Sequence, residues 1–172
     1  MLSRHQADGQ VMLTAGPGHA KILAHEAVRE GADLVVAWGG DGTINEVASA
    51  LMHSRAALGI VPMGSGNGLA REIRVPADHE AALLAALTGT DRTIDAGELN
   101  GRVFFNSAGV GFDAHVAAAF ATSAGHARGF ASYASITLRE LFRYEPGEYV
   151  IRVRADDGAL TSDGMVAVTV TR

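Results

Sequence analysis

The stretch Asp33-Leu-Val-Val-Ala-Trp-Gly-Gly-Asp-Gly-Thr-Ile-Asn-Glu46 decides the fold of this chain. Residues 34–38 form a short apolar run of the kind found in buried parallel strands, and apolar residues recur at helical spacing through residues 44–52. The three glycines between them are therefore expected at a strand-to-helix turn. Glycine lets a ligand approach the backbone closely, and a helix N-terminus offers N–H groups to an anion. The turn is predicted to bind phosphate, although spacing alone also fits a structural glycine turn capped by Asp or Thr.

Asp41 is unusual in a loop that would hold a negatively charged ligand. A carboxylate beside a triphosphate is repelled unless it acts through a metal ion, a water molecule or a substrate hydroxyl. The residue type therefore indicates chemistry in addition to binding, and Asp41 is the predicted catalytic residue. Glu46 is expected to cap the start of its own helix or to bond within the loop.

A second glycine loop follows about twenty residues later. Leu58-Gly-Ile-Val-Pro62 reads as another short strand, followed by Met63-Gly-Ser-Gly-Asn-Gly68 and a helical stretch over residues 69–73. Two such units in tandem place both loops at the carboxyl edge of one parallel sheet, where open α/β folds bind ligands. Neither loop has the Gly-Lys-Ser/Thr ending of a P-loop or the spacing of a dinucleotide fingerprint.

These two motifs resemble those of the diacylglycerol kinase and sphingosine kinase family, of which the bacterial lipid kinases are the nearest branch. The resemblance continues in order through Arg92-Thr-Ile-Asp-Ala-Gly97, Val103-Phe-Phe-Asn-Ser-Ala-Gly-Val-Gly-Phe-Asp113 and Arg128-Gly-Phe-Ala-Ser-Tyr133. It implies an α/β fold: a three-layer Rossmann-like domain of the NAD kinase and phosphofructokinase type, followed by the start of a β-sandwich domain. It also implies transfer of the γ-phosphoryl group of ATP, with Mg²⁺, to a hydroxyl of diacylglycerol or a related lipid.

The resemblance assigns roles to individual residues. Asp41 would orient the metal-bound water or accept the hydroxyl proton. Asp113 falls in the segment that resembles the lipid head-group site, and a helix cap for residues 113–121 is an equally open interpretation. Ser65 stands where the family usually has Thr and keeps the hydroxyl. The implied nucleotide contacts are Thr14, Gly39, Gly40, Asp41, Gly42, Thr43, Ile44, Asn45, Gly64, Ser65, Gly66 and Asn67.

The chain also departs from the family pattern. We expect it to be truncated at both ends, because the first strand, a late acidic segment associated with a metal ion and a late Glu proposed as general base have no counterpart. Two alternatives therefore stay open: a nucleotide-binding fragment without catalysis, or a kinase of the NAD kinase or phosphofructokinase type acting on a soluble substrate. The seven histidines are scattered, so none is assigned to a metal.

The pattern of elements divides the chain near residue 91. Residues 1–91 are predicted to form the α/β nucleotide-binding domain, and residues 92–172 a partial β-rich lipid-substrate domain with two helical stretches. Asn100-Gly101 is a strong two-residue hairpin signal, and Asp156-Asp157-Gly158 is a second predicted turn. The predicted strands are 10–14, 33–38, 57–62, 92–98, 102–107, 149–155 and 165–171, and the helices of the first domain are 19–30, 44–52, 67–73 and 78–88.

Composition restricts the partners. A net charge of −5 argues against general binding to nucleic acid, and the absence of cysteine fits a reducing compartment. We expect a cytoplasmic protein whose membrane contact, if it has one, is peripheral, because no apolar run reaches the roughly 20 residues that span a bilayer. Arg128, Arg139 and Arg143 alternate with apolar residues, which fits a core-facing helix or a membrane-facing one. Loss of the first strand would expose apolar surface and favour self-association into a homo-oligomer.

Overall fold

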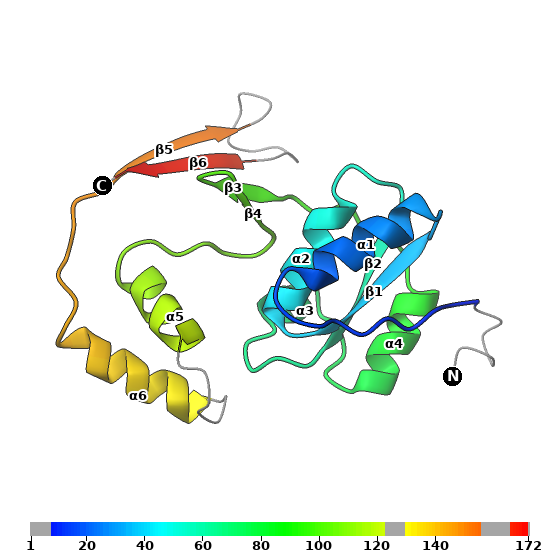
Figure 1. Cartoon of the computed structure of the whole chain (residues 1–172), viewed down its shortest axis with the longest axis horizontal. Helices are drawn as coiled ribbons and strands as arrows, with labels where there is room; N and C mark the ends of the chain where they lie inside the picture. Colours follow the sequence, from blue (N-terminus) through cyan, green and yellow to red (C-terminus); the bar gives the residue numbers. More distant parts are fainter. Residues whose placement is uncertain (1–7, 123–129, 156–165, 172) are drawn as a thin grey trace. The chain divides into compact units, whose positions relative to one another are not determined.

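The computed structural model describes residues 8–122, 130–155 and 166–171 (Figure 1). The chain divides into two compact units, Met1–Ile94 and Asp95–Arg172, which we call the first and second unit. The fold is mixed α/β, with a small parallel sheet in the first unit. Among the described residues, no helix is both long and apolar enough to cross a bilayer.

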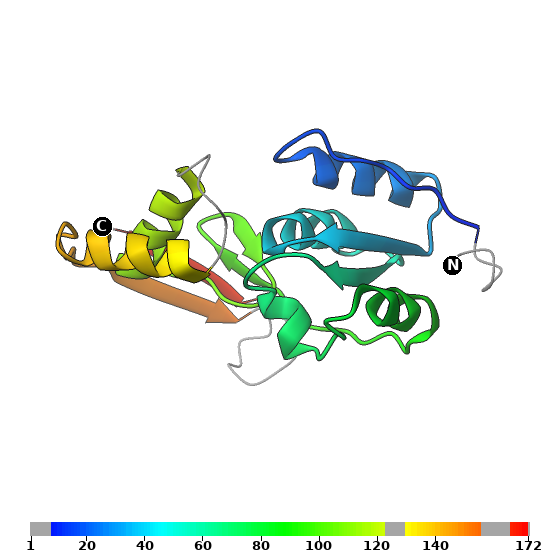
Figure 2. The same ribbon diagram turned by 90° about the horizontal axis from the view of Figure 1, so that it is seen from below.

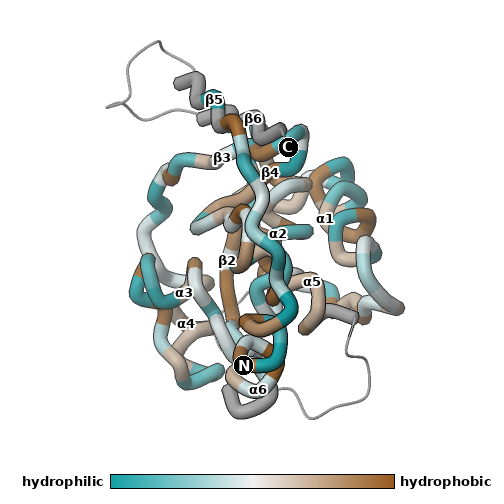
Figure 3. The backbone as a smooth tube through the Cα atoms, turned by 90° about the vertical axis from the view of Figure 1, so that its left-hand side faces the viewer, coloured by the Kyte–Doolittle hydropathy of each residue, from teal (hydrophilic) through white to brown (hydrophobic). Residues whose placement is uncertain are grey.

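The parallel sheet consists of β1 (Leu34–Gly39) and β2 (Ala57–Pro62), as predicted from their apolar runs. The two strands pair in register from Leu34 opposite Ala57 to Gly39 opposite Pro62. β2 is hydrophobic along most of its length (Figure 3), as expected for a strand covered on both sides. Because the pairing runs to the last residue of each strand, the segments that follow both strands leave the sheet at the same edge.

Four helices complete the first unit: α1 (His19–Arg29), α2 (Asp41–Leu51), α3 (Gly68–Glu72) and α4 (His79–Thr88). α2 connects the two strands and packs on both of them and on α1, whereas α4 packs on β2. Figure 2 shows the sheet between α1 and α2 on one side and α4 on the other. A Cβ added to Gly59 would lie 2.8 Å from the Cβ of Ala86, so this glycine lets α4 approach β2 closely.

The core of the first unit is built on α2 and β2. Ile44 and Val61 are among the largest fully buried side chains, and Ala20, Ala24 and Ala48 are also buried. Each buried branched side chain contributes roughly 1.5–3 kcal/mol relative to an exposed one. α2 is therefore anchored by its apolar face, and its polar residues can make other contacts.

Two predictions for the first unit are wrong. α2 begins at Asp41, three residues before the predicted start, because Gly40 acts as its N-cap and accepts a bond from the Ile44 N–H at 3.0 Å. Residues 10–14 do not form a strand, and Val11 and Leu13 are 80% and 85% exposed. A strand needs a partner for its backbone groups, and the sheet of the first unit contains only β1 and β2 among the described residues.

The second unit contains a four-stranded sheet in the order β4-β3-β6-β5. The predicted hairpin is confirmed: β3 (Gly97–Leu99) and β4 (Arg102–Phe104) are joined by Asn100 and Gly101, with φ values of 49° and 78°. Both strands are shorter than predicted. β5 (Val150–Ala155) and β6 (Val166–Thr171) confirm the last two predicted strands. The predicted turn at residues 156–158 lies outside the described residues.

β3 runs parallel to β6, and β5 antiparallel to β6. The two predicted helical stretches are α5 (Phe112–Thr122) and α6 (Phe130–Leu141), which pack against each other.

Candidate functional site

The two glycine loops meet at the carboxyl edge of the parallel sheet. The Met63 N–H donates to the Gly39 carbonyl at 2.8 Å, which extends the strand pairing into the loops. A Cβ added to Gly64 would lie 2.9 Å from the Cα of Gly40, and one added to Gly40 would lie 3.2 Å from the Cα of Gly64. The backbones of the loops are therefore in direct contact, and a larger residue at Gly64 would force them apart.

Asp41 joins the two loops through its carboxylate. Its Oδ2 accepts a bond from the Asn67 N–H at 2.8 Å, and its Oδ1 accepts one from the Gly68 N–H at 2.7 Å. These donors belong to the first residues of α3, whose N-cap Asn67 makes no side-chain capping bond of its own. The carboxylate at the start of α2 therefore caps the neighbouring helix α3, at a position where helix dipoles favour negative charge.

Asn67 closes the second loop. Its Oδ1 accepts from the Gly64 N–H at 2.8 Å and its Nδ2 donates to the Gly64 carbonyl at 2.7 Å. Its backbone is left-handed, with φ 52°, a conformation that Asn tolerates better than most residues. A Cβ at Gly66 would lie 2.8 Å from the Asp41 Oδ2, so this glycine leaves room for the carboxylate.

On the other side of α2, Glu46 contacts the segment before α1. Its Oε1 accepts a bond from the Gly18 N–H at 2.8 Å. The expectation that Glu46 caps its own helix or bonds within its loop is wrong, because its partner lies 28 residues earlier in the chain. Sequence reasoning missed this contact, since a carboxylate that accepts a backbone N–H leaves no signature in the residue type of its partner.

The remaining predicted nucleotide contacts differ in exposure. Thr14, Gly42 and Ser65 are exposed, whereas Ile44 is only 2% exposed and offers a ligand its backbone at most. Thr43 lies in the first turn of α2 and close to Gly39. A Cβ added to Gly39 would lie 2.7 Å from the Cβ of Thr43. The loops thus bring together Gly39, Gly40, Asp41, Gly42, Thr43, Gly64, Ser65, Gly66 and Asn67, and Asn45 follows within α2.

Asp113 lies in the second unit, in the first turn of α5. The helix begins one residue earlier, at Phe112, so Asp113 is not the residue that precedes the helix. A Cβ added to Gly109 would overlap the Asp113 carboxylate, which shows that the side chain folds back over the segment before the helix. An acidic residue in a first turn is favourable to the helix dipole.

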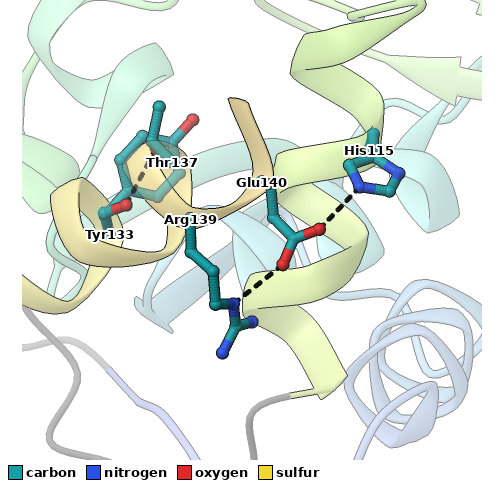
Figure 4. Close-up of polar contacts among 5 residues, drawn as sticks. All are labelled: His115, Tyr133, Thr137, Arg139 and Glu140. Carbon is teal, nitrogen blue, oxygen red and sulfur yellow. Dashed lines mark hydrogen bonds and ion pairs between the residues drawn. The ribbon is translucent and has the colours of Figure 1, made fainter. Parts of the chain in front are cut away.

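The second unit holds an ionic cluster that sequence reasoning missed (Figure 4). Glu140 of α6 is 7% exposed, and its two carboxylate oxygens contact His115 Nε2 and Arg139 Nε, each at 2.9 Å. The bond with His115, and then the bond from Arg139, lower the pKa of the Glu140 carboxyl below its ordinary value. The cluster links α5 to α6. The basic and apolar alternation around Arg139 did not reveal it, because His115 lies 25 residues earlier.

The part of the chain that the structure describes contains no cluster of three or more His, Asp or Glu side chains placed to hold a metal ion. Asp41 is the carboxylate that lies between the two glycine loops. It is chemically suited to a hard cation that arrives with a phosphate ligand, because such cations prefer oxygen ligands.

Comparisons with known proteins relate this chain to a family. The sequence profile of the diacylglycerol kinase catalytic domain matches residues 1–99, which include both glycine loops. A YegS-like protein of Pseudomonas aeruginosa, named a probable lipid kinase, is 44% identical over 110 residues, 63% of this chain and 36% of the relative. The diacylglycerol kinase of Bacillus subtilis is 43% identical over 103 residues, 57% of this chain and 33% of the relative.

The fold comparison covers both units. A crystal structure from Bacillus anthracis, assigned as a diacylglycerol kinase, matches with a TM-score of 0.62 and 24% identity, over 90% of this chain and 51% of that one. At this identity the likeness shows the fold alone. The chain spans 33–36% of the two curated relatives above and about half of this structure.

Proposed function

This chain belongs to the diacylglycerol kinase catalytic-domain family, and on that premise we propose that it is the nucleotide-binding part of an ATP-dependent lipid kinase. The reaction would transfer the γ-phosphoryl group of ATP to a hydroxyl of diacylglycerol or a related lipid. One observation carries the proposal: two glycine loops meet at one edge of a parallel sheet, with a single carboxylate bonded across them.

The backbone of the first loop and the first turn of α2 would bind the phosphates. Glycine at positions 39, 40 and 42 permits close approach to the main chain, and the N–H groups of the first turn of α2 are suited to an anion. The hydroxyls of Ser65 and Thr14 would add contacts from the flanking segments. Mg²⁺ bound to the phosphates would neutralise part of their charge.

Asp41 would have two tasks. Its bonds to the Asn67 and Gly68 N–H groups fix the carboxylate in one orientation. Each carboxylate oxygen has a further lone pair, so the group can still accept the proton of a lipid hydroxyl or orient a water molecule. Asp113 would contribute to recognition of the lipid head group.

The properties of the complete protein are part of the same proposal. The two-stranded sheet would belong to a larger three-layer Rossmann-like sheet, and the sheet of the second unit to a β-sandwich. ATP as substrate favours a cytoplasmic site of action. Peripheral membrane contact is supported by the exposed apolar side chains of Leu138 (60%), Leu141 (57%) and Phe142 (83%), next to Arg139 and Arg143.

The first test is a titration of the 172-residue chain with MgATP. Binding is measured by calorimetry and by the fluorescence of Trp38, the single tryptophan of the chain. Trp38 is 53% exposed and directly precedes Gly39, so its emission should respond to a ligand at the loop. We expect saturable binding that weakens in Asp41→Asn. Absence of binding at millimolar MgATP would refute the proposal for this chain.

Transfer of labelled phosphate from ATP to a short-chain diacylglycerol in mixed micelles is the second test. NAD and fructose 6-phosphate are the control acceptors. Labelling of either control instead of the lipid would favour a soluble-substrate kinase. Binding without any transfer, even when the chain is completed with the remaining segments of a curated relative, would favour a nucleotide-binding module.

A further inference from the structure

Glu46 makes an unusual bond for a residue in the middle of a helix. Its carboxylate accepts the N–H of Gly18, which immediately precedes α1 and has a φ of +83°. Gly18 is the N-cap residue of α1. As a glycine it has no side chain that could accept the first N–H groups of the helix. Glu46 therefore supplies from α2 an acceptor for the N–H of the N-cap residue itself, the bond that a Glu or Gln at the third helix position makes in a capping box and that Lys21 cannot make here.

The segment before α1 is otherwise held by bonds within itself. The Ala15 N–H donates to His19 Nδ1 at 2.8 Å, and the His19 N–H donates to the Gly16 carbonyl at 3.2 Å. These bonds give residues 15–19 a defined shape, but they do not connect it to α2. The Glu46 carboxylate makes that connection. α1 itself packs on α2 and buries Ala20 and Ala24, so removal of the carboxylate should loosen the segment without detaching the helix.

We propose that Glu46 is a positioning residue that ties the segment 14–18 to α2, the helix that follows the first glycine loop, so that Thr14 is presented to the nucleotide. The inference rests on the proposed function, because it takes Thr14 as a nucleotide contact. Asp41 plays the corresponding part for the second glycine loop, where it holds residues 67–68. α2 thus carries two carboxylates, five residues apart, of which one holds the start of α3 and the other holds the residue before α1.

The role of Glu46 depends on its acceptor oxygen and not on its charge. A negative charge near bound phosphates opposes their binding, so the charge of the Glu46 carboxylate does not by itself strengthen nucleotide binding. Glu46→Gln keeps an oxygen acceptor and removes the charge, whereas Glu46→Ala removes both. The two variants therefore separate positioning through a hydrogen bond from an electrostatic or metal-binding role.

Two readouts test the inference in the 172-residue chain: hydrogen exchange of the Gly18 amide by NMR, and MgATP affinity by calorimetry. For Glu46→Ala we expect Gly18 exchange to accelerate and the dissociation constant to rise about five- to tenfold, the loss typical of one hydrogen bond. Glu46→Gln should stay within about threefold of the wild type in both readouts. Glu30→Ala, which removes an exposed carboxylate at the far end of α1, is the control and should change neither.

Each other outcome overturns a distinct statement. Unchanged affinity in Glu46→Ala, with wild-type binding intact, overturns the positioning role alone. A Glu46→Gln variant as weak as Glu46→Ala overturns the hydrogen-bond basis. Failure of the wild type to bind MgATP overturns the proposed function and the positioning role together. If Glu46→Ala does not fold, Glu46→Asp replaces it, because it keeps the charge and withdraws the acceptor by one methylene; wild-type affinity in Glu46→Asp would then overturn the inference.

Discussion

Replacement of Asp41 by Asn should destabilise the first unit as well as impair nucleotide binding. A purely catalytic role for Asp41 would mean that this substitution leaves the fold intact and removes only activity. The structure predicts a different result, because both carboxylate oxygens accept backbone N–H groups of α3, at 2.8 and 2.7 Å. An Asn side chain can satisfy one of these donors, and its NH₂ group would then face the other donor.

The expected loss follows from the number and type of bonds. A hydrogen bond to a charged group contributes about 1.5–3 kcal/mol, and the lower end applies here because Asp41 is exposed. Asp41→Asn loses one such bond and gains a contact between two donors, so we expect a loss of roughly 1.5–3 kcal/mol. For a unit of this size, each kcal/mol lowers the melting temperature by about 4–8 °C.

Thermal unfolding followed by circular dichroism and by Trp38 fluorescence measures this loss. Asp78→Asn is the matched control, because Asp78 caps α4 through a single bond from the Ala81 N–H at 2.9 Å. Asn is also a good N-cap residue, so the control should lose only a few tenths of a kcal/mol. A melting temperature of Asp41→Asn equal to that of the wild type would refute the reasoning, and any loss of activity could then be assigned to chemistry alone.

Three further predictions address other parts of the molecule. Gly64→Ala should abolish MgATP binding while β1 and β2 remain folded, because its Cβ would lie 2.9 Å from the Gly40 Cα; wild-type affinity would contradict the contact between the loops. Leu13→Lys should reduce self-association in light scattering, because this 85% exposed apolar side chain has no described partner strand; an unchanged molar mass would count against this surface. Glu140→Gln should lower the melting temperature of the second unit at pH 7 but not at strongly acidic pH. The lowered pKa of Glu140 means that its stabilisation is complete above the ordinary glutamate pKa of about 4.3 and is lost as pH falls through the folded-state value. A pH-independent difference would refute the ionic contribution.

The sequence predicted those elements whose signals are local. β1 and β2 are continuous apolar runs, and the Asn100-Gly101 turn requires two residues that tolerate positive φ. The start of α2 was misplaced because glycine is a poor helix former, whereas in the structure Gly42 lies in a first turn stabilised by burial further along the helix. The prediction of a strand at residues 10–14 was wrong although the local residue pattern suits a strand, because pairing also depends on a partner strand.

The candidate site was predicted as a set of residues and not as a set of bonds. The positions of both glycine loops followed from the strand, loop and helix order. The contacts of Asp41 and Glu46 did not, because their partners are backbone N–H groups whose position depends on the fold and not on residue type. The bond between His115 and Glu140 was not predicted either, because it joins two helices whose packing the sequence pattern does not specify.

The bonds of α2 also imply an order of assembly during folding. The acceptors on this helix reach donors 26, 27 and 28 residues away, whereas the bonds within the second loop span only three. The pairing of Gly39 with Pro62 already spans 23 residues, so these bonds add little loop-closure entropy once β1 and β2 have paired. A nascent chain would therefore join the two glycine loops as it completes the βαβ core. Because the Asp41 bonds are exposed to solvent, the joined loops should be among the first features lost when the native state opens locally.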